Sequence, residues 1–283
     1  MEATRITESI CYHAEGPIWS DSWGGLRWVD MLAGDIMHLD ADGQVHRISV
    51  PSPVVACVRP RAGGGAVLGV EKGFALESPD GEFTVLEDLW EGEIRMNEGA
   101  AAPDGSFYCG SMAYDQSEDA ASMWRLSPQL EVTRVADRLT VSNGLAFSPD
   151  RTLAYYVDTP TGRVDVLDVD PTAGLHNRRT FADLSDQDGH PDGLTVDAEG
   201  HVWVAMNNGG QVLGLDDLGI PAQRITVGAR QVTACTFGGE DLATLYITTS
   251  RENLPEDEDP AAGSLFAATP GARGQAEELV FTG

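Results

Sequence analysis

Short apolar runs alternate with turn residues along the whole chain, and helical periodicity is scarce. Runs such as residues 26–30 (LRWVD) and 201–206 (HVWVAM) are rich in Val, Leu, Tyr, Trp and Thr, and Gly, Asp, Asn and Pro interrupt them. Short strands joined by tight turns produce this pattern. We therefore expect a chain made almost entirely of β-structure.

A recurring phrase divides the chain into about six units. The phrase places Asn or Asp close before Gly, adds small or apolar residues and ends in a turn such as Pro-Asp-Gly; it occurs at Asn97, Asn143 and Asp192. Asn97 and Asn143 are 46 residues apart, and Asn143 and Asp192 are 49 apart; Glu15, also followed by Gly, precedes Asn97 by 82 residues, close to two units. Repeats of about 40–50 residues with four short strands are typical of β-propeller blades. The sequence predicts an all-β, six-bladed β-propeller that occupies residues 1–283 as a single domain.

The six units also predict how the ring is built. They begin, in chain order, at Glu15, VVAC (54–57), Asn97, Asn143, Asp192 and TACT (233–236). The innermost strand of each blade should start near the phrase and line a central channel. To close the ring, we expect ITESICYHA (6–14) or LVFTG (279–283) to add a strand to the blade at the other end of the chain.

Four polar side chains occupy the equivalent place in their units: Glu15, Asn97, Asn143 and Asp192. One Asn or Asp before Gly is commonly a turn residue, but the second and sixth units have no carboxylate at this place. Because equivalent positions in a ring face the same axis, these side chains should meet in the channel. Two carboxylates and two amides are the oxygen ligands that a hard divalent cation prefers. The sequence therefore predicts one divalent metal in the central channel.

The charge of the chain excludes two classes of partner. Lys and Arg number 18 and Asp and Glu 45, which gives a formal net charge of −27. Such an acidic protein repels nucleic-acid phosphates and anionic membranes, and the charge slightly favours a monomer. The first ten residues lack the layout of a signal peptide, no apolar run is long enough to span a bilayer, and the four cysteines are scattered. These features indicate a cytoplasmic protein with reduced thiols.

Other catalytic motifs are poorly represented. The sequence has no G-x-S-x-G elbow and no Gly-rich phosphate loop, and no Cys–His constellation can be argued from it. His13 and His190 lie close in sequence to Glu15 and Asp192. We expect these histidines to lie in loops or to contact the site residues without binding the metal or the substrate themselves.

The ordered set of phrases resembles the SMP-30/gluconolactonase/LRE family, also called regucalcin-like. The phrases that carry the resemblance span Ala14 to Phe266: AEGPIWS, LRWVD, RMNEGAAAPDGSFYCGSM, VSNGLAFSPD, YYVDT, NRRTF, PDGLTVDAEGHVWVAMNNGGQV, TACTFGG and AGSLF. The resemblance implies a six-bladed propeller with one divalent metal in the channel.

The resemblance also implies roles for individual residues. Glu15, Asn143 and Asp192 match the metal ligands of the family, whereas Arg95 and Asn97 match residues that contact the substrate, or in the case of Asn97 a metal-bound water. Glu98 is a departure, because many relatives carry Asp after the Asn. The loop that contains residues 115–120 matches no particular substrate specificity.

These observations lead to a functional hypothesis. A bound cation can activate both water and an ester carbonyl, and Asp192 is the candidate general base. We expect a metal-dependent hydrolase that opens sugar (aldono-)lactones such as glucono-1,5-lactone. A promiscuous esterase or organophosphatase and a non-catalytic calcium-binding propeller remain alternatives, and the metal could be Ca, Zn, Mn, Mg or Fe(II).

Overall fold

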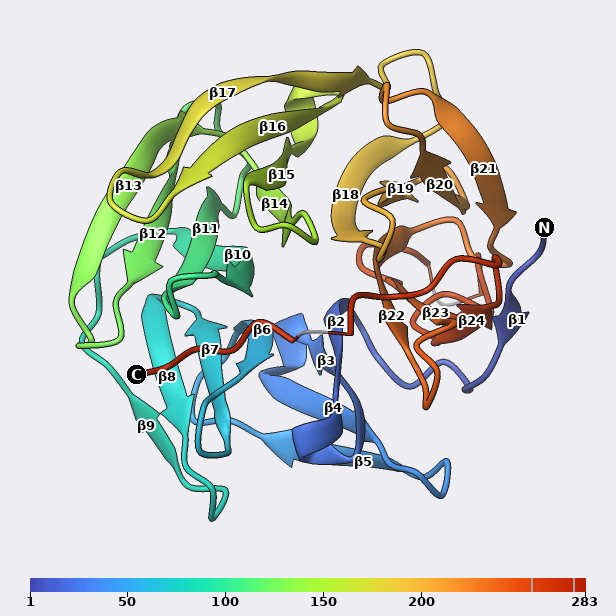
Figure 1. The fold of residues 1–283 in the computed structure, drawn as a ribbon. Coiled ribbons are helices and arrows are strands. Elements are labelled where there is room, and N and C mark those ends of the chain that lie inside the picture. Colours follow the sequence, from blue (N-terminus) through green and yellow to red (C-terminus); the bar gives the residue numbers. More distant parts are fainter. Residues whose placement is uncertain (256, 277) are drawn as a thin grey trace.

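A computed structural model describes residues 1–255, 257–276 and 278–283. These residues form six four-stranded antiparallel sheets, which are arranged as the blades of a closed ring (Figure 1). The prediction of an all-β, six-bladed propeller is confirmed. The only helices in the described ranges are three 3₁₀ turns, Asp21–Trp23, Met31–Ala33 and Thr159–Thr161.

The blades follow the chain in order, and the first strand of each is the innermost. Blades 1 to 3 contain β2 (Ala14–Ser20), β3 (Gly25–Asp30), β4 (Asp35–Leu39) and β5 (Val45–Ser49); β6 (Val55–Pro60), β7 (Ala66–Val70), β8 (Gly73–Glu77) and β9 (Phe83–Val85); and β10 (Ile94–Ala101), β11 (Phe107–Ala113), β12 (Ala121–Leu126) and β13 (Val132–Leu139). Blades 4 and 5 contain β14 (Ser142–Phe147), β15 (Leu153–Asp158), β16 (Arg163–Asp170) and β17 (Gly174–Asp183); and β18 (His190–Val196), β19 (Val202–Asn207), β20 (Gln211–Leu215) and β21 (Pro221–Thr226). Blade 6 combines β22 (Val232–Gly238), β23 (Thr244–Thr249) and β24 (Phe266–Ala268) with the N-terminal β1 (Thr4–Arg5).

Apolar side chains between neighbouring blades form the core. Phe74 of blade 2 meets Phe107 of blade 3 edge to face at 5.8 Å, and Trp203 of blade 5 meets Phe237 of blade 6 in the same way at 5.7 Å. A single four-stranded blade has two apolar faces and can bury both only between two neighbours. Radial packing therefore accounts for the near-continuous apolar composition of the inner strands.

The inner strands crowd around the channel axis. Their residues pack against the inner strands of both neighbouring blades. A Cβ on Gly193 would lie only 2.3 Å from the Cβ of Ala234 on the next blade, so a larger residue does not fit there. This close approach explains why small residues follow the polar position of the repeat.

The ring closes through the N-terminal end of the chain. In β1, Thr4 pairs with Ala267 and Arg5 with Phe266 of β24. The closing strand therefore lies just before residues 6–14, the segment that the sequence suggested. Residues 6–14 instead run from the outer edge of blade 6 back to the axis, where the chain enters β2.

The C-terminal end makes a separate contact. After the chain crosses one face of the ring, Phe281 forms an isolated parallel β-bridge with Arg61, which follows β6 of blade 2 (Figure 1).

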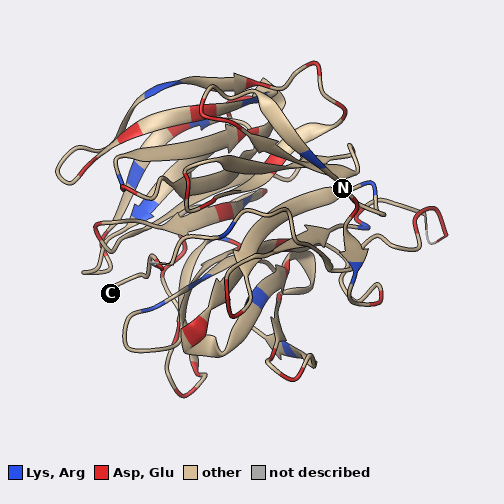
Figure 2. Ribbon diagram, turned by 45° about the vertical axis from the view of Figure 1, so that its right-hand side comes forward, with Lys and Arg blue, Asp and Glu red and all other residues tan. Residues whose placement is uncertain are grey.

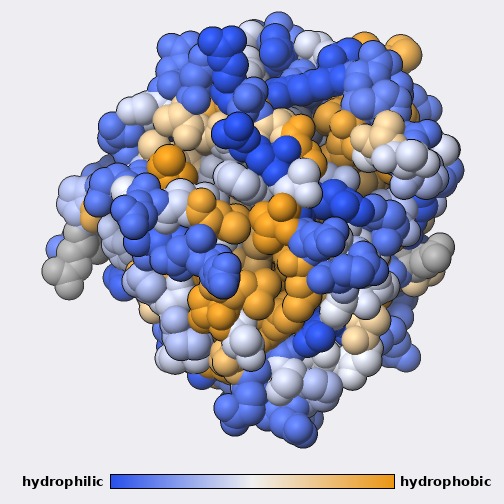
Figure 3. All heavy atoms as spheres, turned by 90° about the vertical axis from the view of Figure 1, so that its left-hand side faces the viewer, coloured by the Kyte–Doolittle hydropathy of each residue, from blue (hydrophilic) through white to orange (hydrophobic). Residues whose placement is uncertain are grey.

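The surface is dominated by acidic groups. Figure 2 shows Asp and Glu spread over the loops and strands of the ring, with fewer Lys and Arg among them. The side of the ring in Figure 3 has a hydrophilic border and a central area of apolar residues.

Two partly buried tryptophans pack together between blades 2 and 3: the ring centres of Trp90 and Trp124 lie 5.6 Å apart. In the part of the chain that the structure describes, no helix has the length and apolarity of a membrane span.

Candidate functional site

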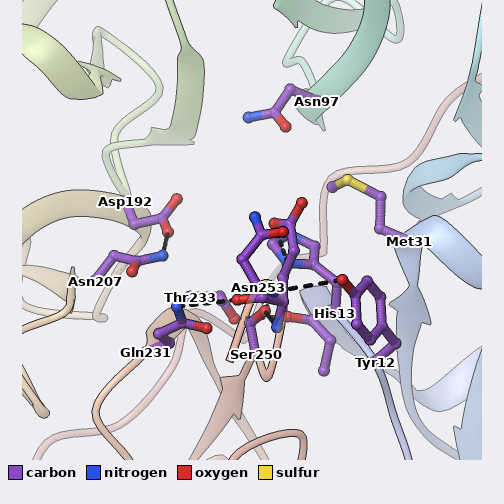
Figure 4. A network of polar contacts seen from close by, with 12 residues as sticks. Tyr12, His13, Met31, Asn97, Asp192, Asn207, Gln231, Thr233, Ser250 and Asn253 are labelled. Atoms are coloured by element: carbon purple, nitrogen blue, oxygen red, sulfur yellow. Dashed lines mark hydrogen bonds and ion pairs between the residues drawn. The ribbon is translucent and has the colours of Figure 1, made fainter. Parts of the chain in front are cut away.

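One mouth of the channel collects the polar side chains that the repeat singled out. Glu15 in β2, Asn97 in β10, Asn143 in β14 and Asp192 in β18 are all buried, with at most 5% of each residue exposed. They lie near the starts of the inner strands, where the ends of the antiparallel second strands also arrive. Figure 4 shows Asn97 and Asp192 on different sides of one shared space.

A local irregularity accompanies each of these positions. The register between each inner strand and its neighbour shifts between Glu15 and Ile18, Met96 and Gly99, Ser142 and Leu145, and Pro191 and Leu194. Such irregularities turn a side chain out of the regular alternation of a strand. The repeated phrase thus encodes a kink at the place where each polar side chain enters the channel.

Asp192 has one satisfied and one unsatisfied carboxylate oxygen. Nδ2 of Asn207, at the end of β19, donates to Oδ2 of Asp192 at 2.8 Å, whereas Oδ1 is buried without a hydrogen-bond partner among the described residues. Burial raises the pKa of Asp192 to about 7; the hydrogen bond from Asn207 opposes this shift and the charge of Glu98 adds to it. An unpaired carboxylate oxygen in a buried site costs free energy and is expected to have a ligand.

Glu15 is a second buried carboxylate of the same cluster. Its Oε2 accepts a hydrogen bond from the Gly16 amide at 2.9 Å. Burial raises the pKa of Glu15 well above its usual value, and the neighbouring charges of Asp192 and Glu98 raise it further. The channel therefore holds acidic groups whose charges need a cation.

A chain of amide hydrogen bonds fixes Asn143. Its Oδ1 accepts from Nδ2 of Asn97 at 3.1 Å, and its Nδ2 donates to Oγ1 of Thr159 at 2.8 Å. Asn97 also accepts from Nη1 of Arg95 at 2.6 Å and donates to the Ser142 carbonyl at 2.9 Å. Both ends of the Asn97 amide are thus engaged, so a direct contact to substrate would replace one of these bonds.

Arg95 is the cation nearest to the cluster. Nη1 also donates to the Met96 carbonyl at 3.1 Å, and the guanidinium lies 5.8 Å from the ring centre of Tyr114. No hydrogen bond joins Nε or Nη2 to another described residue. The positive charge opposes the raised pKa values of Glu15 and Asp192, but burial lowers the pKa of Arg95 itself.

The donor set fits a hard divalent cation. It consists of carboxylate oxygens from Glu15 and Asp192, including the orphaned Oδ1, and the amide oxygen of Asn143. No group of three or more His, Cys, Asp or Glu side chains placed to hold a metal occurs within the described residues. The arrangement therefore differs from closed thiolate or imidazole sites and relies on few charged ligands.

Glu98 does not point into this donor set. Its Oε1 accepts from Nη2 of Arg59 on blade 2 at 2.7 Å and from the Gly99 amide at 2.8 Å. The buried ion pair with Arg59 holds the side chain deeper in the channel. The departure at Glu98 thus acts on the cluster through its charge.

Other residues near the site were less evident from the sequence. Asn207 gave no signal, because its phrase does not recur in the other units; its place at the end of a second strand is the feature that could have revealed it. His13 is buried beside Ser250, as expected of a supporting residue, whereas His190 is exposed. In the loop 115–120, Asp115 accepts hydrogen bonds from the amide and hydroxyl of Ser117, which closes a local exposed turn.

The opposite end of the channel has a different character. A cavity of about 370 Å³ lies there. It is lined by apolar residues from the far ends of the inner strands, such as Ile18, Leu145 and Val196, and by charged residues such as Arg59 and Glu278. None of the residues Glu15, Asn143 and Asp192 lines it. The carboxylates and the orphaned oxygen single out the polar mouth as the candidate for chemistry.

The fold and the cluster define a class of protein: a six-bladed β-propeller with buried carboxylates at one mouth of its channel. The chain belongs to the SMP-30/gluconolactonase/LRE-like family, whose region matches residues 13–251.

Its relatives extend over nearly its whole length. The chain is 32% identical over 277 residues to regucalcin of Bos taurus, with 93% of each chain covered. It is 31% identical over 285 residues to the pentonolactonase XacC of Haloferax volcanii, with 98% of this chain and 97% of that protein covered. The crystal structure of a calcium-binding protein, regucalcin, from Agrobacterium tumefaciens superimposes with a TM-score of 0.92 at 26% identity and covers 99% of this chain and 97% of that one.

Proposed function

We propose that the chain is a divalent-cation-dependent hydrolase that opens the ring ester of sugar lactones, with D-glucono-1,5-lactone as the first substrate to test. The observation that carries the proposal is the convergence of two buried carboxylates and an amide oxygen, with Oδ1 of Asp192 left unpaired. The similarity to a pentonolactonase over almost the entire chain supports the same reaction class.

Glu15, Asn143 and Asp192 would hold the cation. When bound, a divalent cation polarises an ester carbonyl and eases the ionisation of water. The all-oxygen donor set favours hard cations such as Ca²⁺, Mg²⁺ or Mn²⁺, and Zn²⁺ and Fe²⁺ are alternatives. The description of the Agrobacterium relative as calcium-binding supports Ca²⁺ as the first ion to test.

The residues of the chain would share the remaining work. Asp192 would accept the proton of the attacking water, and the hydrogen bond from Asn207 would keep its carboxylate in place. Nε and Nη2 of Arg95 make no hydrogen bond to a described residue, and Arg95 would donate to a substrate hydroxyl or to the negative charge that develops on the carbonyl oxygen. Asn97, which is hydrogen-bonded to both Arg95 and Asn143, would fix the positions of these two side chains relative to each other.

A pH-indicator assay tests the proposal. We expect the cation-loaded protein to open D-glucono-1,5-lactone above the spontaneous rate, and Asp192→Ala to abolish this increment. The matched control is Asp217→Ala, which removes an exposed carboxylate of the same blade and should retain wild-type activity. A phosphotriester measured alongside distinguishes a lactonase from a general esterase or organophosphatase. A protein that binds the cation but accelerates neither substrate would be a calcium-binding propeller without catalysis.

Two expectations from the sequence are left as predictions: a cytoplasmic location and a monomeric state. Gel filtration with light scattering would measure the latter.

A further inference from the structure

Blades 2 and 6 contribute none of the four repeated polar side chains, and they are the two neighbours of blade 1. At the polar place of the repeat, blade 2 reads VVAC (54–57) and blade 6 reads TACT (233–236). Their inner strands β6 and β22 both pack against β2, the strand that carries Glu15. Glu15 is thus the one member of the polar cluster that has such a blade on each side.

The Glu15 side chain lacks the support that the other candidate ligands have. Asn143 accepts a hydrogen bond from Asn97, and a side chain of the same blade holds Asp192. The carboxylate of Glu15 accepts a hydrogen bond from the amide of the next residue, Gly16, and from no other described residue. Such a carboxylate keeps a fixed position only if the backbone around it is fixed.

The backbone at Glu15 is kinked. The register between β2 and β3 shifts between Glu15 and Ile18, so Gly16 and Pro17 lie outside the regular pairing. Gly16 has a left-handed φ of +54°, and Pro17 has no amide hydrogen. A carbonyl inside such a kink depends on donors from outside its own sheet.

Blade 2 supplies a donor on one side of Glu15. Nη1 of Arg59 donates to the Gly16 carbonyl at 3.1 Å, and Nη2 of the same guanidinium donates to Oε1 of Glu98 at 2.7 Å. Glu98 lies in the kink of β10, where the register with β11 shifts. The planar fork of an arginine can reach both acceptors at once. Arg59 therefore ties the kink of blade 1 to the kink of blade 3.

Blade 6 supplies a donor on the other side. Thr233 is fully buried at the same mouth (Figure 4) and lies in the kink of β22, where the register with β23 shifts between Val232 and Ala234. Its Oγ1 donates to the Ala14 carbonyl at 2.6 Å and lies 2.8 Å from Oγ1 of Thr248. Because the carbonyl can only accept, the Thr233 proton is committed to Ala14, and the Thr248 hydroxyl donates to Thr233.

We propose that Thr233 and Arg59 are positioning residues for the divalent cation, because they hold the carbonyls immediately before and after Glu15 and so fix the Glu15 carboxylate in its binding position. The inference rests on the cation-dependent function proposed above and adds a role for the two blades that flank blade 1. Neither residue touches the cation or the substrate. Loss of either hydrogen bond would free one end of the kink, and the cation would then have to order the carboxylate as it binds.

Calorimetric titration of the EDTA-stripped and dialysed protein with Ca²⁺ tests the role of Thr233. Thr233→Val removes the hydroxyl at nearly constant shape and should weaken Ca²⁺ binding about 10-fold, and Thr233→Ser, which restores a hydroxyl, should recover most of the affinity. The matched control is Thr236→Val, the same exchange in the same strand beside the cavity at the far end of the channel; it should bind Ca²⁺ like the wild type. A merely structural role predicts that both valine variants lower the Tm in EDTA and leave the Kd unchanged.

Arg59→Lys tests the other side of Glu15 and also serves if Thr233→Val folds poorly. A lysine keeps the positive charge beside Glu98, but one ammonium group cannot serve both acceptors in the geometry of the guanidinium. We expect Ca²⁺ binding roughly 3- to 10-fold weaker than in the wild type. Wild-type affinity in either variant would remove that residue from the proposal, and wild-type affinity in both would overturn it.

The binding measurement is independent of the reaction. A protein whose Ca²⁺ affinity depends on Thr233 and Arg59 but that opens no lactone would keep the positioning roles and refute the lactonase. A protein that opens the lactone with unchanged Ca²⁺ affinity in both variants would keep the lactonase and refute the positioning roles. A wild type that binds none of Ca²⁺, Mg²⁺, Mn²⁺ and Zn²⁺ would overturn both.

Discussion

Replacing Asp192 by Asn should remove a pH-dependent loss of stability from the cation-free protein. In the folded chain, burial and the charge of Glu98 raise the pKa of Asp192 to about 7, whereas an Asp in an unfolded chain titrates near 3.9. Below about pH 4 the Asp192 carboxyl is protonated in both the folded and the unfolded chain, so this group does not lower the free energy of unfolding there. As the pH rises toward 7, only the unfolded state releases its proton, and the free energy of unfolding falls.

The size of the effect follows from the two pKa values. Each pH unit well between them changes the free energy of unfolding by about 1.36 kcal/mol, and the slope halves at pH 7, where the folded carboxyl is itself half ionised. The step from pH 5 to pH 7 should therefore cost the wild type about 2.3 kcal/mol relative to the variant. A chain of this length has an unfolding entropy of roughly 0.6 kcal/mol/K, so the wild-type Tm should fall by about 4 °C more than that of Asp192→Asn. Any constant cost of the new amide cancels in this comparison.

Scanning calorimetry in EDTA at pH 5, 6 and 7 measures the effect. Asp217→Asn, at an exposed position of the same blade, should follow the wild type at every pH. Parallel Tm curves for the wild type and Asp192→Asn would refute the reasoning, because they would mean that Asp192 is not a buried carboxylate in need of a cation.

Three further predictions concern closure, positioning and cation binding. Deleting residues 1–8 removes β1 from blade 6 and should lower the Tm by several degrees in thermal unfolding, and an unchanged Tm would argue against closure by β1. Asn207→Leu should weaken cation binding about 10- to 100-fold in a calorimetric titration, because Asp192 loses the hydrogen bond that Asn207 donates to its Oδ2; wild-type affinity would contradict that role. Glu15→Gln should reduce the Tm increase that a saturating divalent cation gives the wild type, and an equal increase would exclude Glu15 as a ligand.

The sequence predicted the ring and its polar positions because both are periodic. Asn97, Asn143 and Asp192 recur at the interval of a blade, and the change from polar to small residues marks the kink where each inner strand meets the axis. Hydrophobic alternation and turn residues are local properties, so they can be read without knowledge of the fold. The assignment of residues 1–283 to one domain stays a prediction.

The parts that escaped prediction depend on contacts between strands or between units. Neither Asn207 nor Glu252 belongs to a recurring phrase. Asn207 reaches Asp192 through the pairing of β19 with β18 within blade 5, whereas the ring brings Glu252, after β23, beside His13. The closing strand β1 has two paired residues, too few to give a hydrophobic pattern. The side-chain amide of Asn97 accepts a hydrogen bond from Arg95 and donates one to Asn143. These two bonds depend on side-chain geometry, which the sequence pattern does not contain.

The most direct test of the account is cation-dependent recovery of lactone opening. The protein is stripped with EDTA, each divalent cation is returned in turn, and the hydrolysis of D-glucono-1,5-lactone is followed beside Asp192→Ala and Asp217→Ala. We expect the stripped protein to be inactive, a hard cation to restore activity to the wild type and to Asp217→Ala, and Asp192→Ala to stay inactive. Full activity in EDTA, or recovery of Asp192→Ala by the same cation, would contradict it.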